Sequence, residues 1–299
     1  MRVNPNIVPS ILLDMQQDQS AVNKWLQQLS TGLKVNQPSD DPAASAGMVQ
    51  NSIQSANVDQ FTKNVSSVLT MAQSADSALS SVVTSLTSAI SLGTQGANGT
   101  NTAANRQAIA EQVQGILTSV VAQANASYGG THLFGGTATT VPYAADASSP
   151  TGYTYNGNDG TNSVQVGDGL SVQTNLPGSQ IFSNSSSDVL GALSNLVTAL
   201  QTGDTTSIGN ATSAVSSALS YVSQQRVFYG NVQNQLNAQE TYLQKETVNL
   251  TSQAKSLVGA DLAHAATMLA QAQTANTAAQ AAAAKVLPTT ILNYLAVPN

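Results

Sequence analysis

The 299-residue sequence has no cysteine, and aromatic residues make up only 4% of it. The absence of cysteine excludes disulfides and fits a protein that lives outside the cell without them, although it fits many cytosolic proteins too. Alanine, serine, threonine, glutamine and asparagine dominate instead. Helices made of such small residues bury little area per residue, so we expect a weakly stabilised isolated subunit whose missing burial comes from assembly.

Charge is also scarce. Charged residues form 8% of the chain, its formal net charge is −6, and no basic stripe is available to displace counterions from phosphates. We therefore expect no nucleic-acid partner. We also expect no membrane partner, because no apolar run approaches the roughly 20 residues that span a bilayer. The first residues, Met1 to Asn6, lack the apolar core of a cleaved signal peptide, so an exported chain would leave by another route.

Apolar residues recur at alternating steps of four and three along residues 61–89. This rhythm predicts a helix with one apolar stripe and a polar outer surface, which needs a partner helix. Residues 229–257 approximate the same spacing, and residues 258–286 repeat it one residue out of phase beside Gly259. We expect a joint there between two helical segments. The candidate rod-core residues are Phe61, Val65, Val68, Leu79, Val82, Leu86, Val232, Leu236, Leu243, Leu250 and Leu257.

An amphipathic pattern over residues 10–33 leads into a segment that breaks and restarts a helix. Gly32 and Pro38 end the first helix. Ser39, Asp40 and Asp41 offer acceptors to the free N–H groups of the next one, and Pro42 suits its first turn. We expect a helix, a bend and a capped helix.

The middle of the chain changes in texture. Residues 106–124 predict a further helix, which the pair Gly129-Gly130 is expected to close. Between 131 and 185, short alternating runs bounded by Asn156-Gly157 and by Gly167-Asp168-Gly169 indicate β-hairpins. Helical patterns resume at Asp188.

These patterns predict a mainly α fold with a small β insert, in which the N- and C-terminal segments form a long antiparallel coiled-coil rod. We expect three regions. The terminal helical assembly region takes residues 1–45 and 258–299, the helical rod takes 46–130 and 186–257, and the β-rich outer domain takes 131–185.

Two blocks of residues carry a family resemblance. The first is Leu29-Ser30-Thr31-Gly32 with the segment from Asn36 to Ala44; the second runs from Gln225-Arg226 through Gly259-Ala260-Asp261-Leu262-Ala263 to Asn293-Tyr294-Leu295. Together they resemble the bacterial flagellin superfamily, over nearly the whole chain. The insert segments 133–136, 153–157 and 176–182 are similar to those of its hook-associated protein 3 branch, which sits at the hook–filament junction.

The resemblance implies a secreted structural protein that is exported unfolded through the flagellar type III apparatus. Such a subunit self-assembles into a ring and connects hook-associated protein 1 to the flagellin filament. It also implies termini that are disordered in the monomer and form a coiled coil on assembly, and an export chaperone on residues 258–295. The candidate assembly and chaperone residues are Trp25, Leu26, Leu29, Leu262, Leu269, Val286, Leu292 and Leu295.

No catalytic, cofactor or metal site is predicted. The carboxylates Asp40 and Asp41 suit a helix cap better than a metal, and His132 and His264 are too few for a histidine site. Asn156 to Gly160 is faintly similar to a calcium loop, but a hairpin turn explains it. Arg106 and Arg226 are candidates for hydrogen bonds between helices or subunits, and a surface role explains each equally well.

Three other functions stay open at this point. The chain could be the major flagellin filament subunit, which copy number would reveal. A coiled-coil surface adhesin is compatible with the Ser, Thr and Asn content, but it predicts a cleavable signal or an anchor. An enzyme would need a larger insert and a convergent polar site.

Overall fold

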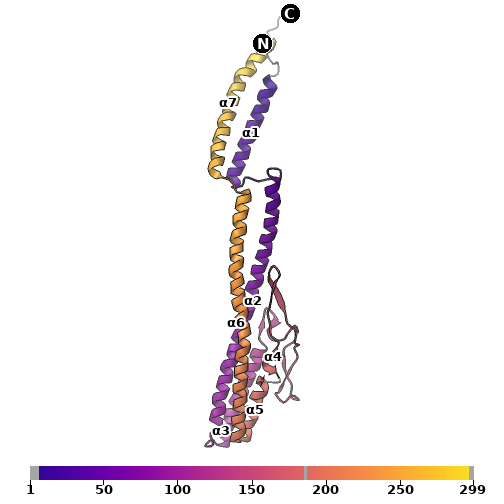
Figure 1. Ribbon diagram of the computed structural model, residues 1–299, viewed down its shortest axis with the longest axis vertical. Helices are drawn as coiled ribbons and strands as arrows, with labels where there is room; N and C mark the ends of the chain where they lie inside the picture. Colours follow the sequence, from indigo (N-terminus) through magenta and orange to yellow (C-terminus); the bar gives the residue numbers. More distant parts are fainter. Residues whose placement is uncertain (1–6, 185–186, 296–299) are drawn as a thin grey trace. The chain divides into compact units, whose positions relative to one another are not determined.

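The computed structural model describes residues 7–184 and 187–295, and most of these residues are helical. The chain divides into two compact units: Met1–Ala56 with Glu246–Asn299, and Asn57–Lys245. Both boundaries fall inside long helices, so α2 and α6 contribute to each unit. The helices are α1 (Ile7–Thr31), α2 (Pro42–Gly96), α3 (Ala103–Ala124), α4 (Gly178–Phe182), α5 (Val189–Thr202), α6 (Thr205–Val258) and α7 (Leu262–Leu295), as drawn in Figure 1.

In the first unit, α1 and α7 lie side by side and run antiparallel (Figure 1). Asn276 Nδ2 donates to Gln19 Oε1 at 2.8 Å, and the rings of Trp25 and His264 meet edge to face with centroids 5.8 Å apart. The residue number of the partner in α7 falls as the residue number in α1 rises, so the two helices are antiparallel. The prediction that the two ends of the chain pair as antiparallel helices is confirmed.

In the second unit, the parts of α2 and α6 that lie within residues 57–245 form a helical core with α3 and α5. Interior residues of α2 follow the predicted heptad stripe, and α3 and α5 pack on each other. The face that α3 buries includes Leu117, whereas the adjacent Ile116 is half-buried. Fully buried side chains include Leu79, Leu86, Leu117, Leu190, Leu193, Leu196, Leu200 and Ile208.

Between α3 and α5 the chain forms small antiparallel strand pairs. These are β1 (Ser127–Tyr128) with β2 (Thr131–His132), β3 (Tyr143–Ala145) with β4 (Tyr153–Tyr155), β5 (Ser163–Gly167) with β6 (Leu170–Gln173), and β7 (Ser183–Asn184) with β8 (Ser187–Asp188). An aromatic cluster forms the core of the insert: the Phe182 ring meets Phe134 and Tyr143 edge to face, at centroid distances of 5.4 and 5.9 Å. The mainly α fold with a small β insert is thus confirmed.

Two details of the insert differ from expectation. Gly129-Gly130 does not close α3, which ends at Ala124; it forms the two-residue turn between β1 and β2, with φ values of +60° and +82°. A tight hairpin turn of this kind needs positive φ at both central positions, and glycine adopts it at no steric cost. The hairpin at Asp168-Gly169, between β5 and β6, is as predicted.

Asn156-Gly157 is the second difference, because it is not a hairpin turn. Strand β4 pairs backward with β3, and the Asn156 N–H extends that pairing by donating to Pro142 O at 2.7 Å. The following loop is held by Asn158, whose Oδ1 accepts from Thr137 N at 2.8 Å and from Gly160 N at 3.0 Å. A side-chain acceptor that satisfies loop amides replaces the expected turn.

Candidate assembly surfaces

The segment that connects α1 to α2 pairs with the segment that connects α6 to α7. Gly32, at φ +70°, follows the last residue of α1. Leu33 forms an antiparallel bridge with Gly259, which lies between α6 and α7. Lys34 N donates to Val258 O at 2.7 Å, and Ala260 N donates to Gly32 O at 2.9 Å. The joint expected at Gly259 is therefore present, and it is tied to the bend at Gly32 through backbone hydrogen bonds.

The two adjacent carboxylates beside this joint have separate tasks. Asp41 Oδ1 accepts from Ala44 N at 2.9 Å and so caps α2, whose first residue is Pro42. Asp40 differs from the expectation, because its Oδ2 accepts from Asn36 N and Gln37 N, each at 2.9 Å, and closes the preceding turn. These two backbone donors hold the pKa of Asp40 below its ordinary value. Pro38 and Ser39 lie exposed in that turn.

Helix α1 has two apolar faces, and α7 covers one of them. Trp25 and Gln28 lie on the covered side, half-buried and buried respectively. Leu26 lies two heptads after Leu12, and Leu29 lies three residues after Leu26. The three side chains therefore share a face of the helix. Their exposed fractions are 54%, 53% and 38%. This second leucine face is left open to solvent.

Exposed apolar side chains gather in the first unit. Among the described side chains, nine of the twelve large exposed apolar residues belong to it: Leu12, Leu13, Leu26, Leu29, Leu33, Val49, Ile53, Val248 and Leu262. Of the predicted assembly residues, Trp25 and Leu269 are half-buried. The side chains of Val286, Leu292 and Leu295 lie outside the described ones.

Most of the predicted rod-core residues are interior. Phe61 and Leu257 are half-buried, and the other nine are buried. Sequence reasoning missed Asn51, a buried residue of α2 whose Nδ2 donates to Leu250 O at 3.0 Å and to Gln253 Oε1 at 3.1 Å. Asn51 continues the heptad that includes Val58 and Val65, so its position in the pattern was a usable signal.

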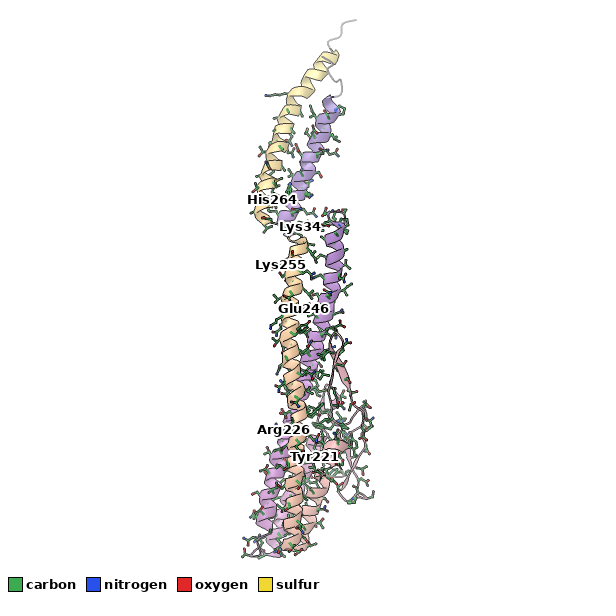
Figure 2. The ribbon with its side chains drawn as sticks, in the orientation of Figure 1. Lys34, Tyr221, Arg226, Glu246, Lys255 and His264 are labelled. Carbon is green, nitrogen blue, oxygen red and sulfur yellow. The ribbon has the colours of Figure 1, made fainter. Side chains whose placement is uncertain are left out.

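Of the two singled-out arginines, Arg226 joins two helices. Its Nε and Nη2 contact both carboxylate oxygens of Asp76 on α2, at 2.9 and 3.1 Å, and Figure 2 labels it on α6. Arg106 lies in the first turn of α3. Its Nη1 donates to Asn101 O at 2.7 Å, and its guanidinium lies against Gly203. Within a single chain, Arg226 is thus an inter-helix group.

The β insert is held on the helices by side chains that bond its backbone. From α2, Asn64 Nδ2 donates to Gln165 O at 2.8 Å, and from α6, Gln239 Nε2 donates to Val166 O at 3.0 Å. Tyr221 donates to Gln180 O at 2.8 Å. The buried Tyr229 hydroxyl accepts from Leu176 N at 3.3 Å, and burial raises the pKa of this phenol well above its usual range. Gln239 lies within the stripe predicted over residues 229–257.

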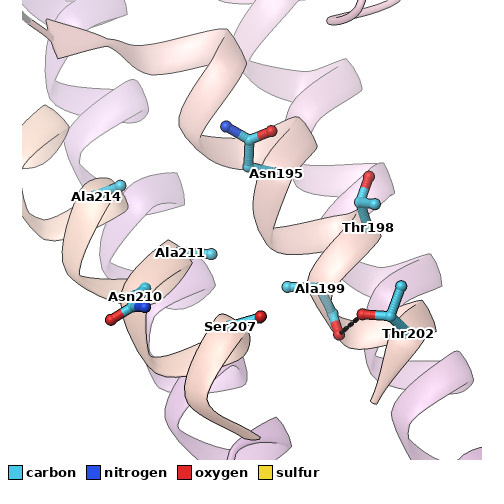
Figure 3. Close-up of a pocket in the computed structure, with 8 residues that line it drawn as sticks. All are labelled: Asn195, Thr198, Ala199, Thr202, Ser207, Asn210, Ala211 and Ala214. Carbon is cyan, nitrogen blue, oxygen red and sulfur yellow. Dashed lines mark hydrogen bonds between the residues drawn. The ribbon is translucent and has the colours of Figure 1, made fainter. Parts of the chain in front are cut away.

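One surface groove of the described residues has a lining of small and polar side chains. This groove, of about 520 Å³, lies between α5 and α6, and its alanine, serine, threonine and asparagine side chains are drawn in Figure 3. In residues 7–184 and 187–295, no group of three or more histidines or carboxylates could hold a metal ion. None of the helices in those residues is both long and apolar enough to cross a bilayer.

Comparison with known families agrees with the paired terminal helices. The family model of the bacterial flagellin N-terminal helical region matches residues 3–139, and that of the C-terminal helical region matches residues 212–295. The chain belongs to the bacterial flagellin superfamily. The two matched regions of this flagellin-family chain contain α1, α2 and α3 on one side and most of α6 with α7 on the other. The insert core and α5 lie largely outside them.

Individual proteins similar to this chain are flagellins by sequence and flagellar hook-associated or junction proteins by fold. Flagellin C of Vibrio cholerae is 28% identical over 152 residues, 49% of this chain and 40% of that protein, so the chain spans well under half of the curated relative. Three solved structures share the fold. FlgL of Bacillus cereus is 25% identical with a TM-score of 0.59, over 70% of this chain and 99% of its own. A candidate flagellar hook-associated protein of Vibrio parahaemolyticus (TM-score 0.68, 21% identity, 74% and 100% covered) and the flagellar junction protein FlgL of Legionella pneumophila (0.61, 14%, 71% and 100%) show the fold alone.

Proposed function

We propose that this chain is the structural subunit of the hook–filament junction, the flagellar hook-associated protein 3. The support is twofold. Structures of FlgL match most of this chain and nearly all of their own length, whereas the chain spans 40% of the flagellin it matches.

The open leucine face of α1 is the observation that carries the proposal. An isolated helical pair has no reason to keep Leu12, Leu26 and Leu29 in water, because burying a half-exposed leucine is worth about 1 kcal/mol. A ring of identical subunits would cover this face with neighbouring terminal helices. The same argument applies to Val49 and Ile53, one turn apart on α2.

The partners follow from this role. Copies of the chain form the ring, hook-associated protein 1 lies on one side and flagellin on the other. An export chaperone binds within residues 258–295 before assembly. The protein acts outside the cell as part of the bacterial flagellum, where its role is structural. Within the described residues, we expect α1 and α7 to form their lasting contacts only when neighbouring subunits of the ring are present.

Substituting the open face tests the role of the terminal helices. The double variant Leu26→Ser/Leu29→Ser should fold like the parent, because both side chains are exposed, but should fail to restore filaments to a strain that lacks its own junction protein. The control is Val227→Ser/Tyr242→Ser, which changes two residues of the second unit that are more exposed, at 59% and 58%. Equal filament recovery by both variants would show that the α1 face is not an assembly surface.

A truncation tests the shared termini directly. Removing residues 260–299 should abolish assembly and leave the second unit folded, since that unit contains none of them. Hydrogen exchange on the full monomer should find the amides of residues 262–295 unprotected. Strong protection there before assembly would contradict the expected disorder.

The major filament subunit is the second candidate, because the curated relatives are flagellins. Copy number separates the two. A filament subunit would dominate the protein of sheared flagella, whereas a junction subunit would be a trace band that remains at the hook end. A dominant band would overturn the junction proposal and keep the family assignment.

A further inference from the structure

The dipeptide Asn-Gly occurs twice in this chain, at 98–99 and at 156–157, in two very different settings. The first lies in the connection between α2 and α3. The second follows β4 in the insert. The same two residues thus serve as an internal comparison of how the fold treats one reactive sequence.

The turn at Asn98 is exposed to solvent, and the Asn98 side chain accepts hydrogen bonds from within the same turn. Asn101 N donates to Asn98 O at 3.1 Å, which closes a four-residue turn. Within the turn, Asn98 Oδ1 accepts from Thr100 N at 3.1 Å and from Thr100 Oγ1 at 2.9 Å. Asn98, Gly99 and Thr100 are all exposed.

We infer that Asn98 is a site of spontaneous deamidation. The Gly99 backbone nitrogen attacks Asn98 Cγ and loses its proton; the bond from Cγ to Nδ2 then breaks, and ammonia leaves. The product is a five-membered succinimide. Water opens this ring at either carbonyl, which gives aspartate or isoaspartate at position 98. No oxidant, reductant or further reactant is required.

Three features of this turn favour the attack. Gly99 has no Cβ to block the approach, and a Cβ built there would meet nothing within 4 Å. In the described part of the chain, no acceptor binds the Gly99 N–H. The two donors of Thr100 withdraw electrons from the Asn98 amide carbonyl, so they make Cγ more electrophilic and stabilise the oxyanion that forms on Oδ1.

The second Asn-Gly pair is held against the same reaction. The Asn156 N–H donates to Pro142 O at 2.7 Å, a shorter bond than the 3.2 Å from Asn98 N to Gln95 O, and the Asn156 carbonyl accepts from Thr140 Oγ1 at 3.1 Å. Gly157 lies under the Tyr155 ring, where a Cβ would come within 2.4 Å of the ring. Because ring closure needs rotation of the asparagine backbone, these contacts should keep Asn156 as an amide.

The product changes the end of the helical unit. Either form of residue 98 gains one negative charge close to the C-terminus of α2, where the helix dipole disfavours it. Isoaspartate also adds a methylene to the backbone of the 98–101 turn. That turn includes Asn101, whose carbonyl accepts from Arg106, so the modification alters the packing of the α2–α3 connection.

The test incubates the purified full-length protein in mildly alkaline, heavy-oxygen water and follows both peptides by mass spectrometry. In the folded protein, conversion at Asn98 should be roughly tenfold or more faster than at Asn156. Each converted residue should carry one heavy oxygen. In denaturant the ratio should fall toward one, because both sites then have the same freedom.

Two variants sharpen the result. Gly99→Ala has room for its methyl group and a backbone φ outside the left-handed region, so it should fold normally and stop conversion at position 98. Thr100→Val removes one donor and should slow it. Conversion at Asn156 that matches Asn98 in the folded protein, or a Gly99→Ala variant that reacts like the parent, would overturn the inference.

Discussion

Arg226 on α6 holds Asp76 on α2 with both arms of its guanidinium, at 2.9 and 3.1 Å. About one-third of each side chain is exposed. The contact joins residues 150 positions apart, between helices whose other interface residues in this unit are almost all apolar. Because the pair is partly exposed, its contribution to stability should be small.

Replacing Arg226 by lysine should lower the free energy of unfolding by about 0.5–1 kcal/mol, because lysine keeps the charge but loses the planar two-armed contact. Urea denaturation of Arg226→Lys, Asp76→Asn and the double variant measures this coupling. The effect should shrink at high salt, since the pair is partly exposed. Additive losses in the double variant would mean that the two side chains do not interact.

Gly93 is required by the close approach of α6. A Cβ there would lie 2.3 Å from Thr212 Oγ1, and that hydroxyl is already engaged with Ile208 O at 2.7 Å. Gly93→Ala should therefore destabilise the protein by about 1–3 kcal/mol despite the better helix propensity of alanine.

Gly115 on α3 is the matched control for this change, because a Cβ there meets nothing within 4 Å. Gly115→Ala should stabilise the protein by about 0.5–1 kcal/mol. Thermal unfolding of both variants, with Thr212→Ala added to the first, decides the matter. The double variant should recover most of the loss, and a failure to recover it would place the strain elsewhere.

The helices and their pairing could be predicted because their information is local and periodic. Val65, Leu79 and Leu86 repeat at heptad spacing, and that spacing alone implies a buried face and a partner. The glycines led to a correct prediction of the joint at Gly259 and to a wrong prediction that Gly129 closes a helix. Both outcomes arise because glycine suits a helix end and a hairpin turn alike.

The contacts that hold the insert on the helices could not be predicted. Tyr229 and Gln239 bind backbone atoms of residues 53 and 73 positions away, and backbone atoms leave no trace in the sequence. The tasks of Asp40 and Asp41 were likewise indistinguishable, since both are adjacent acceptors before a helix. Only the local geometry assigns one to the turn and the other to the cap.

Tyr229 gives the sharpest test of how the insert is held. Tyr229→Phe leaves the buried Leu176 N–H without its acceptor, which should cost about 1–3 kcal/mol of stability. Tyr221→Phe is the control. Its hydroxyl donates to Gln180 O near the surface, where water can replace it, so its loss should stay within about 0.5 kcal/mol. Equal losses for both variants in urea denaturation would argue against a buried anchor at Tyr229.

Asp146, in the turn between β3 and β4, should make the stability of the insert depend on pH in acid. The hydroxyl of Ser148, the hydroxyl of Thr154 and the Ser148 N–H all donate to its carboxylate, which lowers its pKa from 3.8 to about 2. A lowered folded pKa means that the contribution of Asp146 to stability is complete above the unfolded value of 3.8 and is lost as the pH falls toward about 2. NMR titration of the Asp146 carboxyl should show this low midpoint. Thr154→Ala should raise it, and Asp146→Asn should remove the dependence of hairpin stability on pH in that window. A midpoint near 3.8 in the parent protein would show that the three donors do not hold the ionised carboxylate in solution.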